Sequence, residues 1–521
     1  MLNFTRILMN KVLILLLCIG LYTACNNGEN QKNLSKENAQ IPIVSSILED
    51  KESFYYIDFA NYPQMESSLP IGVFDSGTGG LTVLDALVRF DEFNNDQLAE
   101  GSDGMPDFSR ERFIYLADQA NMPYGNYSSE KNVDLLVEHI IKDTHFLLSD
   151  KYYAQVQGDE LIKKQPVKTI VIACNTATAY GKETIEEFLQ KTGIEIKVIG
   201  VIDAGVRGAL EVFEKEGGHG SIGVLATVGT ISSGGYEQTI FKLKEHNGYS
   251  GNIQVFNQGG HGIAEAVDAE PDYIKFALKK PREDYRGPGL NHAEFPIEKS
   301  LLDAYQFDFS NGKVLCDTEQ VDACQILQLN DAENYMRYHL VSLLEQMRKA
   351  ENAEPLKALI LGCTHYPYLT QEIRKILNEL YDFKDGDAFR YRHLMHEKIE
   401  IIDPAVNVAR ELFYYLKEKN MFNATGDMAE SQFFISVPNV GNPNAKLDAD
   451  GRFTYEYKYQ RVPGEIQEYV KVVPFSHQNI PVETISRLAG TIPATYSLIR
   501  EFQKPNSTEG DLSLKAKVPD Q

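Results

Sequence analysis

Short apolar runs alternate with amphipathic stretches from residue 70 onward. This alternation predicts β-strands that are each followed by a helix, and therefore a mostly parallel sheet of the α/β class. The predicted strands span residues 71–74, 113–116, 169–173, 197–201, 221–225, 356–361 and 398–402. Ligands of such folds bind beyond the carboxyl ends of the strands, so the turns after these runs are where function is expected.

Two segments of the chain match each other closely. Residues 169–176 (TIVIACNT) and 358–365 (ALILGCTH) both contain an apolar run, then a cysteine, then a polar residue before a predicted helix. Residues 71–74 (IGVF) are echoed in the same way by residues 222–225 (IGVL). The repeat predicts two similar parallel-sheet α/β domains that face each other across a cleft, with Cys174 and Cys363 on opposite sides of it.

The pattern also suggests domain boundaries. The predicted first domain covers 69–203, the second covers 204–398, and 399–420 returns to the first. Residues 421–521 form a C-terminal extension with strand-like pieces at 432–437 and 452–459 and a helical segment at 482–502, which we interpret as a small added subdomain. Residues 91–110, 151–165 and 268–334 fit the alternation poorly and are interpreted as surface insertions.

The N-terminus resembles an export signal. Arg6 and Lys11 precede an apolar run at 12–20 that is too short to span a membrane, and residues 21–25 (LYTAC) resemble a bacterial lipobox. We therefore predict a signal peptide at 1–25, lipidation of Cys25, and a polar tether at 26–67 that leaves the protein anchored outside the cytoplasm. Ordinary secretory cleavage and an uncleaved anchor are the alternatives, and without a signal the protein would be cytoplasmic.

The amino-acid composition argues against some classes of binding partner. The 521 residues include 74 acidic and 51 basic ones, for a formal charge of −23, which argues against a general affinity for nucleic acid or anionic lipid. An anionic substrate therefore needs local hydrogen-bond donors. The six cysteines are too widely spaced for a dense disulfide framework, and whether Cys316 and Cys324 pair is left open.

The two matched cysteines carry the candidate chemistry. A cysteine between a strand and a helix lies where the helix dipole and free N–H groups favour a thiolate. Moving an α-proton from one face of an amino acid to the other needs two acid/base groups on opposite sides, and a pair of thiols meets that need. A single cysteine is more often a small buried apolar residue. The matched contexts of Cys174 and Cys363 favour catalysis.

Other polar residues lie at the same predicted strand ends. Asp75 begins a glycine-rich turn (75–80, DSGTGG) and is expected to orient or polarise a thiol, although aspartate is also a common helix cap. His365 follows Cys363 closely and could share its proton or simply pack. Cys363 and His365 lack a companion ligand cluster, so no metal site is predicted.

Several further residues offer hydrogen bonds to an acidic amino acid. The turn at 123–125 (PYG) could present the Tyr124 hydroxyl and the Gly125 amide to a substrate carboxylate. Asn175, Thr176 and Thr364 lie at predicted helix starts, where amides and hydroxyls can bind carboxylates without arginine.

Taken together, these motifs resemble those of glutamate racemases in the aspartate/glutamate racemase superfamily. The similarity runs over residues 71–81, 115–118 with 123–125, 173–177, 222–227 and 361–367, in the order found in the family. The resemblance implies a racemase that interconverts L- and D-glutamate and supplies the D-glutamate of peptidoglycan for the cell wall. It also implies that no metal, pyridoxal phosphate or nucleotide is required.

The resemblance assigns roles to individual residues. Cys174 and Cys363 correspond to the paired acid/base catalysts, and Asp75 and His365 to the groups that assist them. The substrate-contact positions of the family correspond to Asp75, Ser76, Tyr124, Gly125, Asn175, Thr176, Thr364 and His365.

The sequence departs from the family at several points. Typical members are shorter and cytoplasmic. The usual cysteine-proline pair and acidic residue after 253–256 are replaced by 257–261 (NQGGH), so either Glu265 or Glu270 would be the acidic helper. An arginine common in the family is Asn121 here.

Three functional alternatives remain open at this stage. The protein could racemise aspartate or another amino acid, bind amino acids as a lipoprotein without turning them over, or catalyse a different reaction on the same scaffold. Association into a homodimer is also left open.

Overall fold

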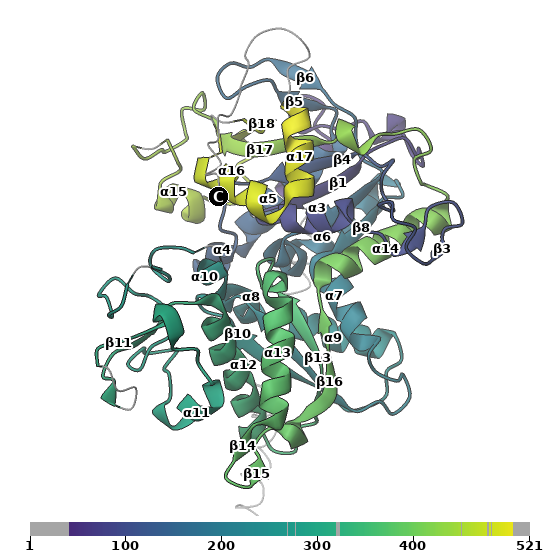
Figure 1. The fold of residues 1–521 in the computed structure, drawn as a ribbon. Coiled ribbons are helices and arrows are strands. Elements are labelled where there is room, and N and C mark those ends of the chain that lie inside the picture. Colours follow the sequence, from purple (N-terminus) through teal and green to yellow (C-terminus); the bar gives the residue numbers. More distant parts are fainter. Residues whose placement is uncertain are drawn as a thin grey trace, which may run out of the picture.

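The protein forms two α/β domains, each built on its own sheet (Figure 1). The computed structural model describes residues 41–503 except 268, 277, 319–322, 450, 477, 478 and 481. The predicted signal peptide and Cys25 lie outside the described residues. Within the described part, no helix is both long and apolar enough to cross a membrane.

The first sheet has six strands in the order β18-β17-β4-β1-β7-β8. Its strands are parallel except for β18, which runs antiparallel to β17. Helices cover both faces, so its central strands are continuously apolar rather than alternating. The strands are β1 (Ile71–Asp75), β4 (Phe113–Ala117), β7 (Thr169–Ile172), β8 (Lys197–Gly200), β17 (Gln432–Pro438) and β18 (Val470–Pro474).

The second sheet has four parallel strands in the order β10-β9-β13-β16. They are β9 (Gly220–Ala226), β10 (Ile253–Gly259), β13 (Leu356–Gly362) and β16 (Met395–Ile402). Each strand predicted from the apolar runs is confirmed in one of the two sheets. β10 and β18 were not predicted, because their apolar positions are interrupted by polar ones.

The helices surround the two sheets. Those associated with the first sheet are α2 (Pro42–Leu48), α3 (Leu81–Val88), α4 (Gly125–Ser129), α5 (Val133–Leu148), α6 (Asn175–Thr192), α14 (Pro404–Lys419), α15 (Tyr455–Gln460), α16 (Val482–Thr491) and α17 (Pro493–Phe502). Those around the second are α7 (Val201–Leu210), α8 (Val228–Ser232), α9 (Gly235–His246), α10 (Ile263–Val267), α11 (Leu302–Tyr305), α12 (Ala332–Lys349) and α13 (Thr370–Asp382).

One apolar core runs from the first domain into the second. It includes Val73 of β1, Val206 of α7 and Val224 of β9. Helix α7 packs against α14, and the contact is close because α7 presents glycines: a Cβ on Gly205 would lie 2.9 Å from Pro404 Cγ. The two domains therefore share a packed interface rather than a loose linker.

The predicted domain boundaries are wrong at three places. The border at 203/204 falls inside α7, and the border at 398/399 cuts β16, which belongs to the second sheet through Ile402. The described part of the tether is not a polar spacer, because Ile43 and Ile47 of α2 are buried in the core of the first domain. The apolar pattern of a segment predicts that it forms a strand or a helix, but it does not predict which of the two sheets the segment joins.

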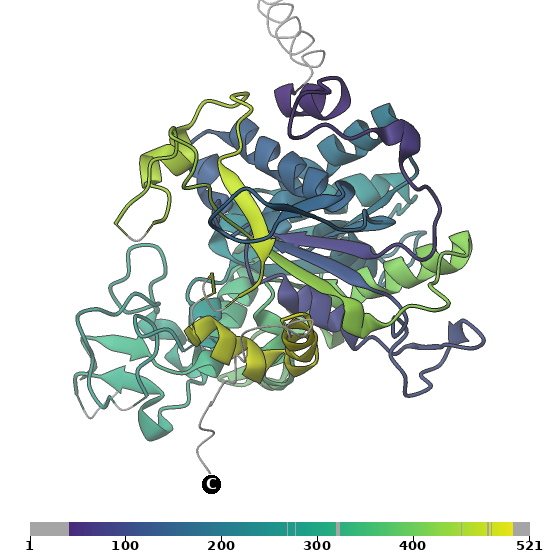
Figure 2. The ribbon, with the colours of Figure 1, turned by 90° about the horizontal axis from the view of Figure 1, so that it is seen from above.

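The C-terminal extension is not a separate subdomain. β17 pairs in parallel with β4, and β18 pairs with β17, so the two strands form one edge of the first sheet, which Figure 2 shows from above. The strand predicted at 432–437 is confirmed. The segment at 452–459 is mainly the helix α15, and the predicted late helix is two helices that are separated at Ile492, before Pro493.

The predicted insertions form small hairpins. They contain β2 (Phe93–Asn94) with β3 (Ala99–Glu100), β5 (Lys151–Tyr153) with β6 (Leu161–Lys163), and β11 (Val314–Cys316) with β12 (Leu327–Leu329); a fourth hairpin joins β14 (Lys384–Asp385) and β15 (Ala388–Phe389). The third insertion is more than a surface feature, because Ile297, Leu301 and Leu327 are buried in the core of the second domain. A disulfide bond joins Cys316 to Cys324 within it.

The C-terminal extension should contribute strongly to the stability of the folded protein. Phe434 of β17 is fully buried and packs on Phe146, with ring centroids 5.2 Å apart. We expect Phe434→Ala to lower the free energy of unfolding by about 3–5 kcal/mol, because it removes a buried aromatic ring and leaves a cavity. Urea denaturation would measure this. Val462→Ala, at a 66% exposed position, is the control; equal stability of the two variants would contradict the role assigned to β17.

Candidate active site

The glycine-rich turn after β1 is held together by Asp75. Its Oδ2 accepts hydrogen bonds from the backbone N–H groups of Gly77 at 3.2 Å and Gly80 at 2.9 Å. The Tyr115 hydroxyl donates to the Gly77 carbonyl at 2.7 Å. The turn is therefore fixed at the carboxyl edge of the first sheet, as the sequence predicted.

Cys174 lies at the same edge. It follows β7 as the N-cap of α6, and its Sγ accepts a hydrogen bond from the Ala177 N–H at 3.4 Å. The thiol donates to Ser76 Oγ at 3.6 Å. Burial raises the pKa of Cys174 to about 12, and the charge of Asp75 contributes in the same direction. The resting form of this residue is a thiol, which can donate a proton.

Asp75 is suited to receive that proton. Burial raises the pKa of its carboxyl group, while hydrogen bonds from the Gly80 and Gly77 amides and from Cys174 lower it. The carboxyl group and the thiol therefore form a coupled pair in which a proton can move between oxygen and sulfur.

Cys363 occupies the equivalent position in the second domain. It follows β13 and is 7% exposed, as Cys174 is. Its Sγ lies 3.7 Å from His365 Nδ1, and Thr364 Oγ1 lies 3.4 Å from the same nitrogen. The predicted thiol–imidazole pair is therefore formed, and His365 can exchange a proton with the sulfur.

The two cysteine loops meet at the domain interface. Asn175, directly after Cys174, donates from Nδ2 to the carbonyl of Gly362, directly before Cys363, at 3.3 Å. The Tyr236 hydroxyl donates to Asn175 Oδ1 at 3.0 Å and fixes the amide. The turn of the first domain also faces the second, because an added Cβ on Gly79 would lie 3.7 Å from Thr364 Oγ1.

A cleft of about 80 Å³ opens between the domains at this place. Its lining includes Asn175, Cys363 and Thr364, together with Arg89 of α3 and Asp403 before α14. Cys174 is not part of this lining; its sulfur is enclosed by Ser76 and the start of α6. Arg89 and Tyr236 were not predicted from the sequence. Asp403 could have been, because it directly follows a predicted strand.

One predicted substrate contact is not available in the form expected. The Tyr124 hydroxyl is 2.6 Å from Asp118 Oδ2 and 2.6 Å from Asp143 Oδ2, and the residue is 1% exposed. The hydroxyl is thus engaged inside the first domain and does not face a substrate. The carboxyl group of Asp143, on α5, holds the Tyr124 hydroxyl there, and no local sequence pattern predicts that contact. Gly125 is the first residue of α4.

The remaining predicted residues are near the thiols or in their loops. Ser76 contacts Cys174, and Thr176 lies half-buried in the first turn of α6. Of the two acidic candidates, Glu265 acts on the same buried hydroxyl as Cys363: burial raises the pKa of Tyr366, and the charges of Cys363 and Glu265 add to that rise. Glu270 is exposed.

Among the described residues, Cys363 and His365 do not belong to a group of side chains that could hold a metal ion. Within the described part of the chain, the side chains close enough to share a metal ion are Cys316, Asp317 and Cys324. Because Cys316 and Cys324 form a disulfide bond, this group does not have free thiolate ligands.

Comparison with known proteins decides the family. No protein-family model matches the chain. The glutamate racemase of Oceanobacillus iheyensis is 35% identical over 366 residues, which cover 70% of this chain and 86% of the relative. The chain belongs to the glutamate racemase family.

The chain is also similar to glutamate racemases of other organisms. The enzyme of Carboxydothermus hydrogenoformans is 26% identical over 386 residues, covering 72% of this chain and 92% of the relative. The crystal structure of the Francisella tularensis glutamate racemase with D-glutamate is 21% identical and covers 76% of this chain and 95% of that one, with a TM-score of 0.38.

The pairing of Asp75 with Cys174 generates a pH prediction. In a Cys363→Ser background, Asp75→Asn should lower the pKa of Cys174 by about one pH unit or more, because a neighbouring negative charge that disfavours the thiolate is removed. The pH dependence of iodoacetamide alkylation would show the change, with faster reaction at a given pH below the midpoint. Asp303→Asn, at an exposed position, is the control. An unchanged or higher midpoint in Asp75→Asn would contradict the pairing.

Proposed function

We propose that this protein racemises glutamate with Cys174 and Cys363 as opposed acid/base thiols. The observation that carries the proposal is that both cysteines are free, buried and placed at equivalent strand ends whose loops are bonded to each other through Asn175 and Gly362. Sequence similarity to glutamate racemases over most of the chain supports glutamate as the substrate.

The geometry supplies a proton path on each side. Racemisation requires one sulfur to remove the α-proton while the other returns a proton to the opposite face. On one side Asp75 takes or returns the proton of Cys174, and on the other His365 does so for Cys363. Each sulfur changes its protonation state once per turnover. The starting protonation states return when Asp75 and His365 exchange their protons with solvent.

The substrate carboxylates need donors, since the whole chain is strongly acidic. The start of α6, with free N–H groups and a positive dipole end, lies directly beside Cys174. The hydroxyls of Ser76 and Thr364 and the amide of Asn175 lie near the two thiols. This local set can bind an anion without an overall positive charge.

Replacing either thiol tests the mechanism. Cys174→Ser and Cys363→Ser should each lower kcat by about 10²–10⁴-fold or more, because a hydroxyl is a poor acid/base at neutral pH. The fold should survive, as serine is nearly isosteric. The matched control is the double variant Cys316→Ser, Cys324→Ser, which removes two sulfurs remote from the site and should retain turnover. Near-normal turnover in either single variant would refute the two-thiol mechanism.

The reaction itself can be observed in D₂O. We expect L- and D-glutamate each to exchange the α-hydrogen for deuterium and to invert, both in the presence and in the absence of a reductant. Absence of exchange with glutamate, followed by exchange with aspartate, would reassign the substrate. Absence of exchange with any amino acid would favour a binding protein.

We also propose that the protein is exported and lipidated on Cys25. The basic residues, the apolar run and the lipobox-like LYTAC segment support export. The disulfide bond between Cys316 and Cys324 suits an oxidising compartment. Both remaining described cysteines are buried and belong to different domains, which would protect them from oxidation there.

Metabolic labelling tests the anchor. An alkyne analogue of palmitate should label the full-length chain, and Cys25→Ala should abolish the label because the acylated cysteine is lost. Cys18→Ala, within the same predicted signal, should keep it. Equal labelling of the two variants, or none of the wild type, would contradict lipidation.

A further inference from the structure

Asn175 of the first domain is held at two points by the second domain. Its Oδ1 accepts a hydrogen bond from the Tyr236 hydroxyl at 3.0 Å, and its Nδ2 donates to the Gly362 carbonyl at 3.3 Å. Tyr236 belongs to α9 and Gly362 ends β13, so both partners come from the other domain. Because a carbonyl oxygen can only accept, the amide of Asn175 cannot turn over without losing its bond to Gly362.

The Tyr236 ring is packed tightly in this position. It is 2% exposed, and it lies against Gly362, where an added Cβ would be 2.8 Å from Tyr236 Cε2. The preceding residue, Gly235, lets α9 approach α6 closely, since a Cβ there would lie 2.7 Å from Ala179 Cβ. The two glycines therefore allow the ring to reach Asn175 across the domain interface, and the packing holds its hydroxyl in one place.

The Tyr236 hydroxyl keeps its proton throughout the proposed reaction. Burial raises the pKa of Tyr236, and the charges of Asp403 and Cys363 add to that rise. A Cys363 thiolate formed during turnover therefore makes loss of the tyrosine proton still less favourable. The bond from Tyr236 to Asn175 Oδ1 can thus persist in either protonation state of the thiol.

Asn175 retains one donor for a ligand. A primary amide has two N–H groups, and the bond to Gly362 uses one of them. Asn175 is half-buried and lines the interdomain cleft together with Cys363 and Thr364. Because both ends of the amide are bonded to the second domain, its plane is fixed. A donor that is already ordered loses little conformational entropy when it binds a carboxylate.

We propose that Tyr236 is a positioning residue for the reaction: by holding Asn175, it keeps the two cysteine loops docked and aims the remaining amide N–H at a substrate carboxylate. This role rests on the proposed racemase function and deepens it. Without the hydroxyl, Asn175 Oδ1 loses its donor and the amide is held at one point only. The substrate is then bound less tightly, whereas both thiols and their proton partners, Asp75 and His365, stay in place.

A double-mutant cycle with L-glutamate tests this role. Tyr236→Phe should raise KM about tenfold and change kcat by less than about threefold, because it removes one positioning hydrogen bond and no acid/base group. In an Asn175→Ala background the same change should alter KM by less than about twofold, since no amide remains to be held. Tyr249→Phe, a buried tyrosine just beyond the other end of α9, is the control and should match the wild type. Equal effects of Tyr236→Phe in both backgrounds would overturn the proposal.

The docking of the loops can be measured without substrate. In full-length Cys174→Ser protein, alkylation of Cys363 by N-ethylmaleimide is followed by mass spectrometry of its peptide, at a pH where the rate no longer rises. Cys363 is 7% exposed, so the reagent reaches it mainly when the loops part. Tyr236→Phe should speed alkylation about fivefold, as expected for one lost hydrogen bond, and adding Asn175→Ala should speed it no further. Asn175→Ala alone should give the same increase, which replaces the first variant if that does not fold.

The two measurements separate this role from the racemase function. Faster alkylation in a protein whose wild type turns over no amino acid would support the docking role and contradict the racemase. Normal KM and an unchanged alkylation rate in Tyr236→Phe, in a protein that racemises glutamate, would overturn the role of Tyr236 and leave the racemase standing.

Discussion

The close packing of α7 on α14 is the contact on which the arrangement of this protein depends. Glycines at 205 and 208 let the two helices approach so closely that a Cβ at Gly208 would lie 2.5 Å from Asn407 Oδ1. The apolar core on both sides of this contact joins the two sheets. Because the cysteine loops extend from the carboxyl edges of those sheets, the helix packing sets how the loops face each other, and the Asn175–Gly362 bond then aligns them.

Burial decides the electrostatics of the site. Removing a thiol from water disfavours its charged form, and a neighbouring carboxylate adds to this effect, so Cys174 is held protonated although it caps a helix. The helix dipole alone would have suggested the opposite. For Cys174 to act as a base, Asp75 must first accept its proton, and the structure places the two groups together.

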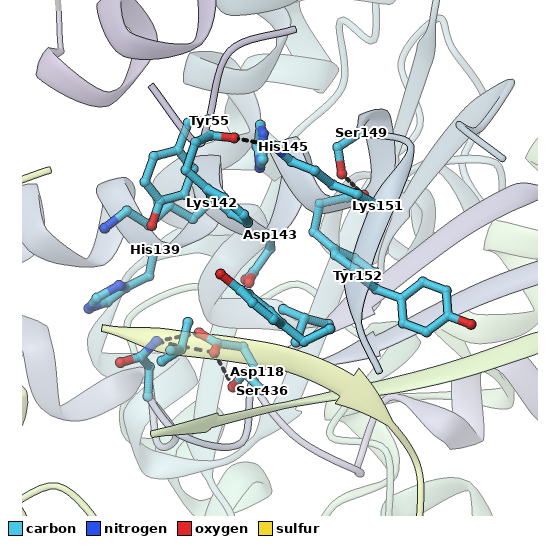
Figure 3. Close-up of a pocket in the computed structure, with 16 residues that line it drawn as sticks. Tyr55, Asp118, His139, Lys142, Asp143, His145, Ser149, Lys151, Tyr152 and Ser436 are labelled. Carbon is cyan, nitrogen blue, oxygen red and sulfur yellow. Dashed lines mark hydrogen bonds between the residues drawn. The ribbon is translucent and has the colours of Figure 1, made fainter. Parts of the chain in front are cut away.

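The segments outside the racemase motifs are integrated into the first domain. Helix α2 packs into its core, and β17 and β18 extend its sheet to six strands. Ser436, Val470 and Val472 from these strands also line a cavity of about 50 Å³ against α5 (Figure 3). The additional chain thus encloses a cavity next to the turn that contains Asn121, without disturbing the parallel strands that carry the thiols.

The sequence by itself determined most of the sheet strands, the α/β class and the positions of both thiols. A parallel strand covered on both faces must be continuously apolar, and a matched cysteine at the end of two such runs is visible in the letters alone. The tertiary structure decided the rest. An apolar segment such as 432–437 predicts a strand but not its partner, and β4, with which it pairs, lies about three hundred residues earlier. The Tyr124 hydroxyl was predicted to face the substrate, but Asp143 on a different helix turns it inward. Such contacts depend on which distant side chains share a buried space, and local patterns do not encode that.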